Sequence, residues 1–156
     1  MTSELLIRPA VRDDAEAISR VIIRALRETN AQDYPPEIIA SVAANFSPER
    51  VSELMGTREV LVAVLADEVV GTASLQGAVV RTVFIVPDHQ ACGIGTALMR
   101  EVERKGRQGG LAHLMVPSSI TAEGFYAKLG FSAIRDEYHG AERTIVMQKV
   151  LGEAAP

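Results

Sequence analysis

The chain has few of the side chains from which disulfide frameworks and metal sites are built. It contains no tryptophan, three histidines and one cysteine, Cys92, in 156 residues. A single cysteine cannot form an internal disulfide, and the scattered histidines share no metal-ligand spacing with it. We therefore expect no metal cofactor. Because no basic segment followed by a long apolar core opens the sequence, we also expect a cytoplasmic location.

Neither charged nor apolar residues gather in long runs. The 16 basic and 20 acidic residues give a net charge of −4 and are spread along the chain, which argues against a nucleic-acid partner. Apolar stretches such as 59–65 and 79–86 fall short of the roughly eighteen residues that a membrane span needs, so we expect no membrane partner. The length favours one domain over 1–156, with a core at about 5–151 and a tail at 152–156.

The first third of the chain has the period of amphipathic helices. A short strand is expected at 5–8, and Asp13-x-x-Glu16 predicts a capping box at the start of the helix that follows it. The apolar residues of this helix recur at three- and four-residue steps: Ala15, Ile18, Ile22, Ala25 and Leu26. Two shorter helices are expected next, and Ser47-Pro48 predicts the beginning of the second.

From Glu59 onward the pattern predicts strands with two helical interruptions. The expected strands are 60–64, 69–75, 78–86, 111–116, 131–138 and 143–149, and the expected helices are 94–105 and 121–129. Short polar turns favour antiparallel neighbours. The strands 78–86 and 111–116 are instead expected to be parallel, because a helical crossover joins them. The fold class is therefore α/β, with a mixed sheet that contains one parallel βαβ unit.

One glycine turn connects a strand directly to a helix. The apolar run from Val83 to Val86 is followed by Gly93 and Gly95 and then by a helical pattern. Backbone N–H groups at such a helix start can bind a phosphate, and the helix dipole adds to the attraction. A third glycine and a Gly-Lys-Ser/Thr sequence are both missing, which disfavours a nicotinamide dinucleotide or a nucleoside triphosphate. A tight turn chosen for packing is the alternative.

Two separated motifs resemble the GNAT superfamily of acyl-CoA-dependent N-acyltransferases. They are Gln90-x-x-Gly93-x-Gly95 and the segment 125–131, Phe-Tyr-Ala-Lys-Leu-Gly-Phe. The resemblance implies a mostly antiparallel central sheet whose parallel unit splays open at an acyl-CoA cleft, with helices on both faces. It implies that acetyl-CoA is the co-substrate. The implied reaction is transfer of the acetyl group to a primary amine of a small molecule, amino acid or peptide, by direct attack on the thioester.

The same resemblance implies roles for individual residues. Phe84, Ile85 and Val86 match the strand that pairs with the pantetheine amides. The pyrophosphate loop corresponds to Gln90, Ala91, Cys92, Gly93, Ile94, Gly95 and Thr96. Tyr126 matches the tyrosine that protonates the CoA thiolate, with a core aromatic as the structural alternative. Ser119 is at the position where many members of the family have asparagine. Its side chain could cap the following helix or contact CoA.

The acceptor side is less defined by the sequence. Tyr34 is the acceptor-side candidate, with a partly buried turn residue as the alternative. Asp88, His89, Glu123 and His139 are candidate general bases, and none is assigned. A protein N-terminal or lysine acetyltransferase and a non-catalytic acyl-CoA sensor are alternative functions. The resemblance also implies that a homodimer is a common assembly.

Overall fold

The computed structural model describes residues 4–90 and 92–152. Its strands are β1 (Leu6–Pro9), β2 (Glu59–Leu65), β3 (Glu68–Gln76), β4 (Val79–Ile85), β5 (His113–Ser118), β6 (Ser132–His139) and β7 (Glu142–Val150). Its α-helices are α1 (Ala15–Glu28), α2 (Pro36–Ala43), α3 (Pro48–Met55), α4 (Ile94–Gln108) and α5 (Glu123–Lys128). Short 3-10 turns cover Arg12–Asp14, Asn30–Gln32, Ala44–Phe46 and Pro87–His89.

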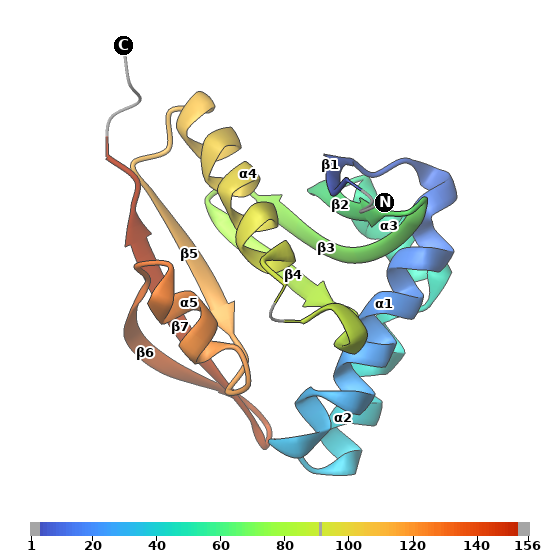
Figure 1. The fold of residues 1–156 in the computed structure, drawn as a ribbon. Helices are drawn as coiled ribbons and strands as arrows, with labels where there is room; N and C mark the ends of the chain where they lie inside the picture. Colours follow the sequence, from blue (N-terminus) through green and yellow to red (C-terminus); the bar gives the residue numbers. More distant parts are fainter. Residues whose placement is uncertain (1–3, 91, 153–156) are drawn as a thin grey trace.

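These strands form one mixed sheet in the order β1-β2-β3-β4-β5-β7-β6. Every neighbouring pair is antiparallel except β4 and β5, which are parallel. Figure 1 shows α4 as the crossover between those two strands. The predicted α/β fold class, with its single parallel unit, is confirmed.

Helices cover both faces of the sheet because alternate strand residues are apolar on both sides. On β2, Val62 packs with residues of α1, α2 and α3, whereas Leu61 and Ala63 belong to the core that contains the buried residues of α4. All three side chains are buried. Within the two described stretches, no helix is both long enough and apolar enough to span a bilayer.

The two parallel strands pair only where they begin. Val79 lies opposite Met115, whose N–H donates to the Ala78 carbonyl at 2.9 Å. No later pair joins β4 to β5 within the described residues, and the C-terminal ends of the two strands lie apart (Figure 1). Pro117 lies two residues after Met115, so its nitrogen is also on the side of β5 that faces β4. Because the two strands are no longer paired there, this position needs no N–H donor, and a proline is tolerated.

The beginning of α1 differs from the prediction. The capping box of Asp13 and Glu16 is wrong, because no side-chain hydrogen bond caps α1, which follows a 3-10 turn. Asp14 instead accepts a hydrogen bond from the Val11 N–H at 2.7 Å and pairs with Arg8 of β1 at 2.8 Å. A tertiary ion pair has therefore replaced the local cap.

Two later boundaries also differ. β5 begins at His113 rather than at residue 111, because the Leu111 N–H closes the end of α4 on the Gly106 carbonyl at 2.9 Å. The helix α5 begins at Glu123 rather than at residue 121. The Ser47 side chain, in contrast, caps α3 as predicted by accepting the Arg50 N–H at 3.3 Å.

Candidate active site

A cavity of about 890 Å³ lies where β4 and β5 diverge. Its walls come from α1, α2, β4, the start of α4, the end of β5, α5 and the β6–β7 hairpin. Ligands of α/β proteins favour the crevice beyond the carboxyl ends of strands that separate. The geometry therefore marks this cavity as the candidate site.

The start of α4 forms one end of the cavity. Gly93 precedes the helix with φ +82°, and a Cβ built on it would meet nothing within 4 Å. Glycine is therefore favoured at residue 93 by the positive φ angle and not by a lack of room for a side chain. Among the residues that the structure describes, no side chain caps this helix start, so the first N–H groups of a helix of 15 residues remain available to an anion.

Gly95 serves a different purpose from Gly93. A Cβ at this position would lie 3.0 Å from two ring atoms of Phe125. The glycine therefore permits close contact between α4 and α5, while the curl of the loop depends on Gly93. Gly93 therefore shapes the turn through its conformation, and the absence of a side chain at Gly95 serves packing against α5.

Most of the residues singled out from the sequence line this cavity. They are Tyr34, Phe84, Ile85, Gln90, Gly93, Ile94, Gly95, Thr96, Ser119 and Tyr126. Ala91 lies outside the described residues. Cys92 is exposed and is not part of the lining.

Val86 is not brought to the cavity. Its side chain is buried, its N–H donates to the Val70 carbonyl at 2.9 Å, and its carbonyl accepts the His89 N–H at 3.0 Å. Both backbone groups of Val86 are used by β3 and by the turn after β4, and its contact with a donor stays a prediction. Backbone groups alternate sides along a strand, so those of Ile85 point away from β3.

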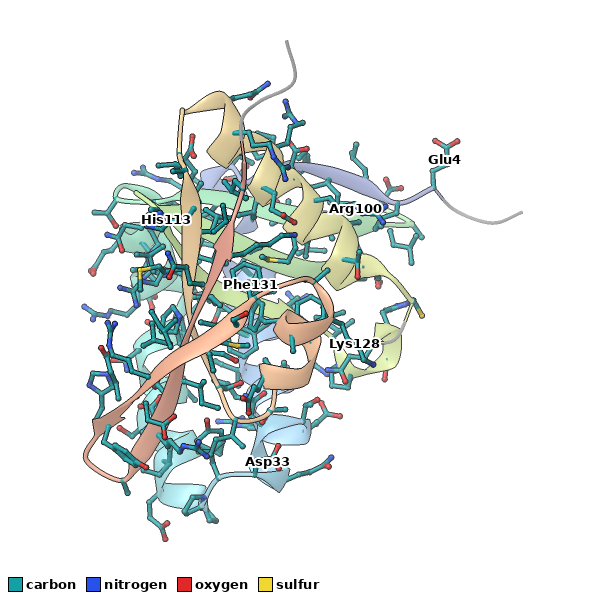
Figure 2. All side chains as sticks on the ribbon, turned by 90° about the vertical axis from the view of Figure 1, so that its left-hand side faces the viewer. Glu4, Asp33, Arg100, His113, Lys128 and Phe131 are labelled. Atoms are coloured by element: carbon teal, nitrogen blue, oxygen red, sulfur yellow. The ribbon has the colours of Figure 1, made fainter. Side chains whose placement is uncertain are left out.

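Tyr126 lies on α5 between two other rings. Its side chain is 4% exposed, and its ring meets Phe125 and Phe131 edge-on, with centroids 5.1 and 5.6 Å away. Figure 2 shows Phe131 beyond the end of α5, where Lys128 lies. Burial raises the pKa of the Tyr126 phenol above its usual range, which keeps the phenol protonated at neutral pH.

Ser119 and Tyr34 make backbone hydrogen bonds. The Ser119 hydroxyl accepts the Ala122 N–H at 3.1 Å, so it caps the turn before α5. The Tyr34 hydroxyl accepts the Ile120 N–H at 2.7 Å and donates to the Arg143 carbonyl at 3.1 Å. Burial raises the pKa of the Tyr34 phenol. Tyr34 therefore lines the cavity and also ties the segment before α2 to β7.

The candidate bases separate into two groups. His89 and His139 line the cavity, whereas Asp88 and Glu123 do not. Asp88 instead accepts a hydrogen bond from Arg24 at 3.4 Å. His113 also lines no part of the cavity, and it lies at the start of β5, far from Asp33 near the other end of the molecule (Figure 2).

Sequence reasoning missed a group of residues on and beside β4. Thr82 has φ +54° at a bulge where β4 loses register with β3, and such a conformation costs about 1–3 kcal/mol. The Arg58 Nη1 donates to Thr82 Oγ1 at 3.0 Å, and Ser74 Oγ donates to the Arg81 carbonyl at 2.7 Å. The only signal available was Arg81, a charged residue inside an otherwise apolar strand.

The β6–β7 hairpin contributes further polar side chains to the lining, namely Glu137, His139, Glu142 and Thr144. Glu137 pairs with Arg135 at 3.0 Å. Across residues 4–90 and 92–152, no group of histidine, cysteine and carboxylate side chains could hold a metal ion. The chemistry of the cavity is therefore that of backbone N–H groups, two phenols, two imidazoles, arginines and carboxylates.

The sequence and the fold are both similar to those of known proteins. The model of the acetyltransferase (GNAT) domain family matches residues 30–151. An uncharacterized N-acetyltransferase of Escherichia coli, YafP, is 26% identical over 135 residues, which are 86% of each chain.

Two solved structures share the fold. A GCN5-related N-acetyltransferase from Rhodopseudomonas palustris is 24% identical, with a TM-score of 0.90 over 96% of this chain and 98% of that one. The PaiA N-acetyltransferase of Thermoplasma acidophilum, solved in complex with coenzyme A, is 20% identical, with a TM-score of 0.80 over 94% and 99%. Because the family model spans most of the sequence, the chain belongs to the GNAT family and is an N-acetyltransferase.

Proposed function

We propose that this enzyme transfers the acetyl group of acetyl-CoA to the primary amine of a small molecule, amino acid or peptide. The observation that carries the proposal is the start of α4, which opens without a side-chain cap into the cavity between β4 and β5. The N–H groups of Gly93 to Thr96 would bind the pyrophosphate. The coenzyme A complex of the Thermoplasma acidophilum protein, which has the same fold, supports this assignment.

The donor would extend from these phosphates back along β4. The backbone groups of Ile85 face away from β3, and beyond the first pair β5 does not cover them. The Ile85 carbonyl accepts the Gln90 side-chain N–H at 3.3 Å, so the Ile85 N–H is the group of β4 that would pair with a pantetheine amide, as an added strand does. Phe84 and Ile85 are both among the residues that line the cavity.

The chemical step would be direct attack. The amine nitrogen forms a bond to the thioester carbon, the carbon–sulfur bond breaks, and the nitrogen loses a proton. Tyr126 lines the cavity as a buried, protonated phenol, and it would supply a proton to the departing thiolate. The proton that the nitrogen loses would then return to the Tyr126 phenolate, directly or through water, so that the net transfer is from nitrogen to sulfur.

The first test is thermal unfolding with acetyl-CoA, with CoA and with ATP. A ligand at about 100 times its Kd adds roughly 2.7 kcal/mol, so acetyl-CoA and CoA should raise Tm by several degrees while ATP does not. Release of free thiol with a panel of amines should follow. Absence of a shift with acetyl-CoA would contradict the proposed donor site, and a shift without thiol release from any amine would favour an acyl-CoA sensor.

A further inference from the structure

Two arginines in the cavity have no carboxylate partner. Arg58, which follows α3, and Arg81, on β4, both line the cavity. The Nε atom of each is buried and has no hydrogen-bond partner. None of the ion pairs within residues 4–90 and 92–152 includes either side chain.

Arg58 reaches the part of β4 that carries Arg81, because it donates to the hydroxyl of the next residue, Thr82, at 3.0 Å. Burial, and then the charge of Arg81, lower the pKa of Arg58, yet a guanidinium keeps its proton in proteins. Both side chains are half-buried, and a partly desolvated charge is stabilised when an anion neutralises it. The carboxylates that line the cavity, Glu137 and Glu142, come from the β6–β7 hairpin, and neither forms an ion pair with these arginines.

Each arginine is also anchored. Arg58 donates through Nη1 to the hydroxyl of Thr82 at 3.0 Å, and the backbone of Arg81 is held by Ser74 at 2.7 Å. One hydrogen bond uses little of the donor capacity of a guanidinium, which presents five N–H groups in a planar fork. That fork matches a carboxylate in two-point geometry. The pair is therefore arranged to receive a planar anion.

The position of the pair along β4 relates it to the reaction. The phosphate-binding end of the cavity follows the C-terminal end of β4, so a donor lying along the strand has its acetyl end directed toward Arg81. Arg81 precedes Phe84 by three residues, about 10 Å of strand. An anion bound there would lie beside the thioester rather than beside the phosphates.

We propose that the acceptor is an amine that carries a carboxylate, of the amino-acid class, and that Arg58 and Arg81 hold this carboxylate while the amine faces the thioester. The inference rests on the proposed acetyl transfer and adds the chemical class of its acceptor. Arg58 and Arg81 would select free amino acids over amines that lack a carboxylate.

Matched acceptors test the inference directly. Each of the twenty amino acids is compared, by thiol release from acetyl-CoA, with its α-amide and with the corresponding decarboxylated amine. Loss of a hydrogen bond to a charged group should lower kcat/KM roughly tenfold to hundredfold, so at least one acid should exceed its amide by that factor. Equal or higher rates with the amides and amines would overturn the inference while leaving acetyl transfer intact.

Variants separate carboxylate binding from a structural role. Arg58→Gln and Arg81→Gln should raise KM for the acid acceptor roughly tenfold to hundredfold, with KM for acetyl-CoA unchanged and the amide rate unaffected. Arg81→Lys should recover part of the loss. Arg50→Gln is the matched control, since Arg50 is exposed on α3 and its ion pair within residues 4–90 and 92–152 is with Glu53.

The remaining outcomes are also decisive. Equal losses for the acid and the amide in the arginine variants would show a structural role and overturn the inference. If wild-type protein is stabilised by acetyl-CoA, but no amino acid reacts and no N-acetyl amino acid stabilises the CoA complex, the inference fails and the donor site stands. If acetyl-CoA itself gives no stabilisation, the proposed function fails first.

Discussion

Replacing a glycine with glutamate at either end of α4 distinguishes an effect on phosphate binding from an effect of backbone strain. Gly93 and Gly110 have nearly the same backbone conformation, with φ +82° and φ +78°, and a Cβ at either position would meet nothing within 4 Å. Gly93 lies at the N-terminal end of the helix and lines the cavity, whereas Gly110 lies just beyond its C-terminal end. Gly93→Glu and Gly110→Glu are therefore matched in conformation and in free space.

The cost to the unliganded protein follows from that conformation. A side chain at positive φ costs about 1–2 kcal/mol, which is roughly 2–8 °C in Tm for a chain of this size. The added carboxylate interacts favourably with a helix N-terminus and unfavourably with a C-terminus, by about 0.3–1 kcal/mol. Without ligand, Gly93→Glu should therefore be at least as stable as Gly110→Glu.

Acetyl-CoA should reverse this order. At about 100 times its Kd the ligand stabilises by roughly 2.7 kcal/mol, or about 5–11 °C. Gly110→Glu should retain the whole shift. Gly93→Glu should lose it, because a carboxylate would stand where the pyrophosphate binds.

The assay is thermal unfolding of wild type and both variants, each with and without acetyl-CoA, with circular dichroism as the check on folding. A folded Gly93→Glu protein that keeps the wild-type shift would refute the placement of the phosphates at the start of α4. Loss of the shift in both variants would assign the effect to the fold rather than to the loop.

Three other substitutions test individual contacts. Tyr126→Phe should lower kcat about 10²–10⁴-fold at unchanged KM for acetyl-CoA; an undiminished kcat at saturating substrates removes Tyr126 from the acid role. Since burial raises the pKa of this phenol, ionisation of Tyr126 should not reduce the wild-type rate below pH about 10. Tyr34→Phe removes the bridge between Ile120 and Arg143 and should cost about 1–3 kcal/mol, and an unchanged Tm would contradict that estimate. Asp14→Asn should cost about 1–3 kcal/mol at pH 7. Because the hydrogen bond from Arg8 lowers the pKa of Asp14 when the chain is folded, this stabilisation is present above the unfolded pKa of about 3.9 and is lost as the pH falls through the lower folded value. The difference in Tm between wild type and Asp14→Asn should therefore shrink below pH about 4, and a constant difference between pH 7 and pH 3 would refute the assignment.

The elements and the glycine turn before α4 could be predicted because their signals are local. The helical steps of Ile18, Ile22 and Leu26 describe a stripe that is buried in the fold. The short turns between strands, the crossover through α4 and the glycine at residue 93 likewise act over a few residues. Periodicity and turn chemistry depend on neighbours in the sequence, so they can be recognised from the sequence without the structure.

Contacts between distant segments required the tertiary structure. Asp14 pairs with a strand rather than capping its helix, and the Tyr34 hydroxyl bonds to residues 86 and 109 positions away. Gly95 lacks a side chain because Phe125 of another helix lies against it. No local preference encodes such contacts, because the relative positions of packed elements decide them.

The sequence by itself determined the order of elements, the parallel unit and the loop before α4, and through two motifs it pointed to the family. Only the tertiary structure decided that Val86 is engaged by β3, that Tyr34 is a bridge, and that Arg58 and Arg81 lie together in the cavity. The sequence pattern of a strand indicates which side chains share a face of the sheet. It does not indicate where two neighbouring strands diverge. The separation of β4 and β5 creates the cavity and selects the side chains that line it.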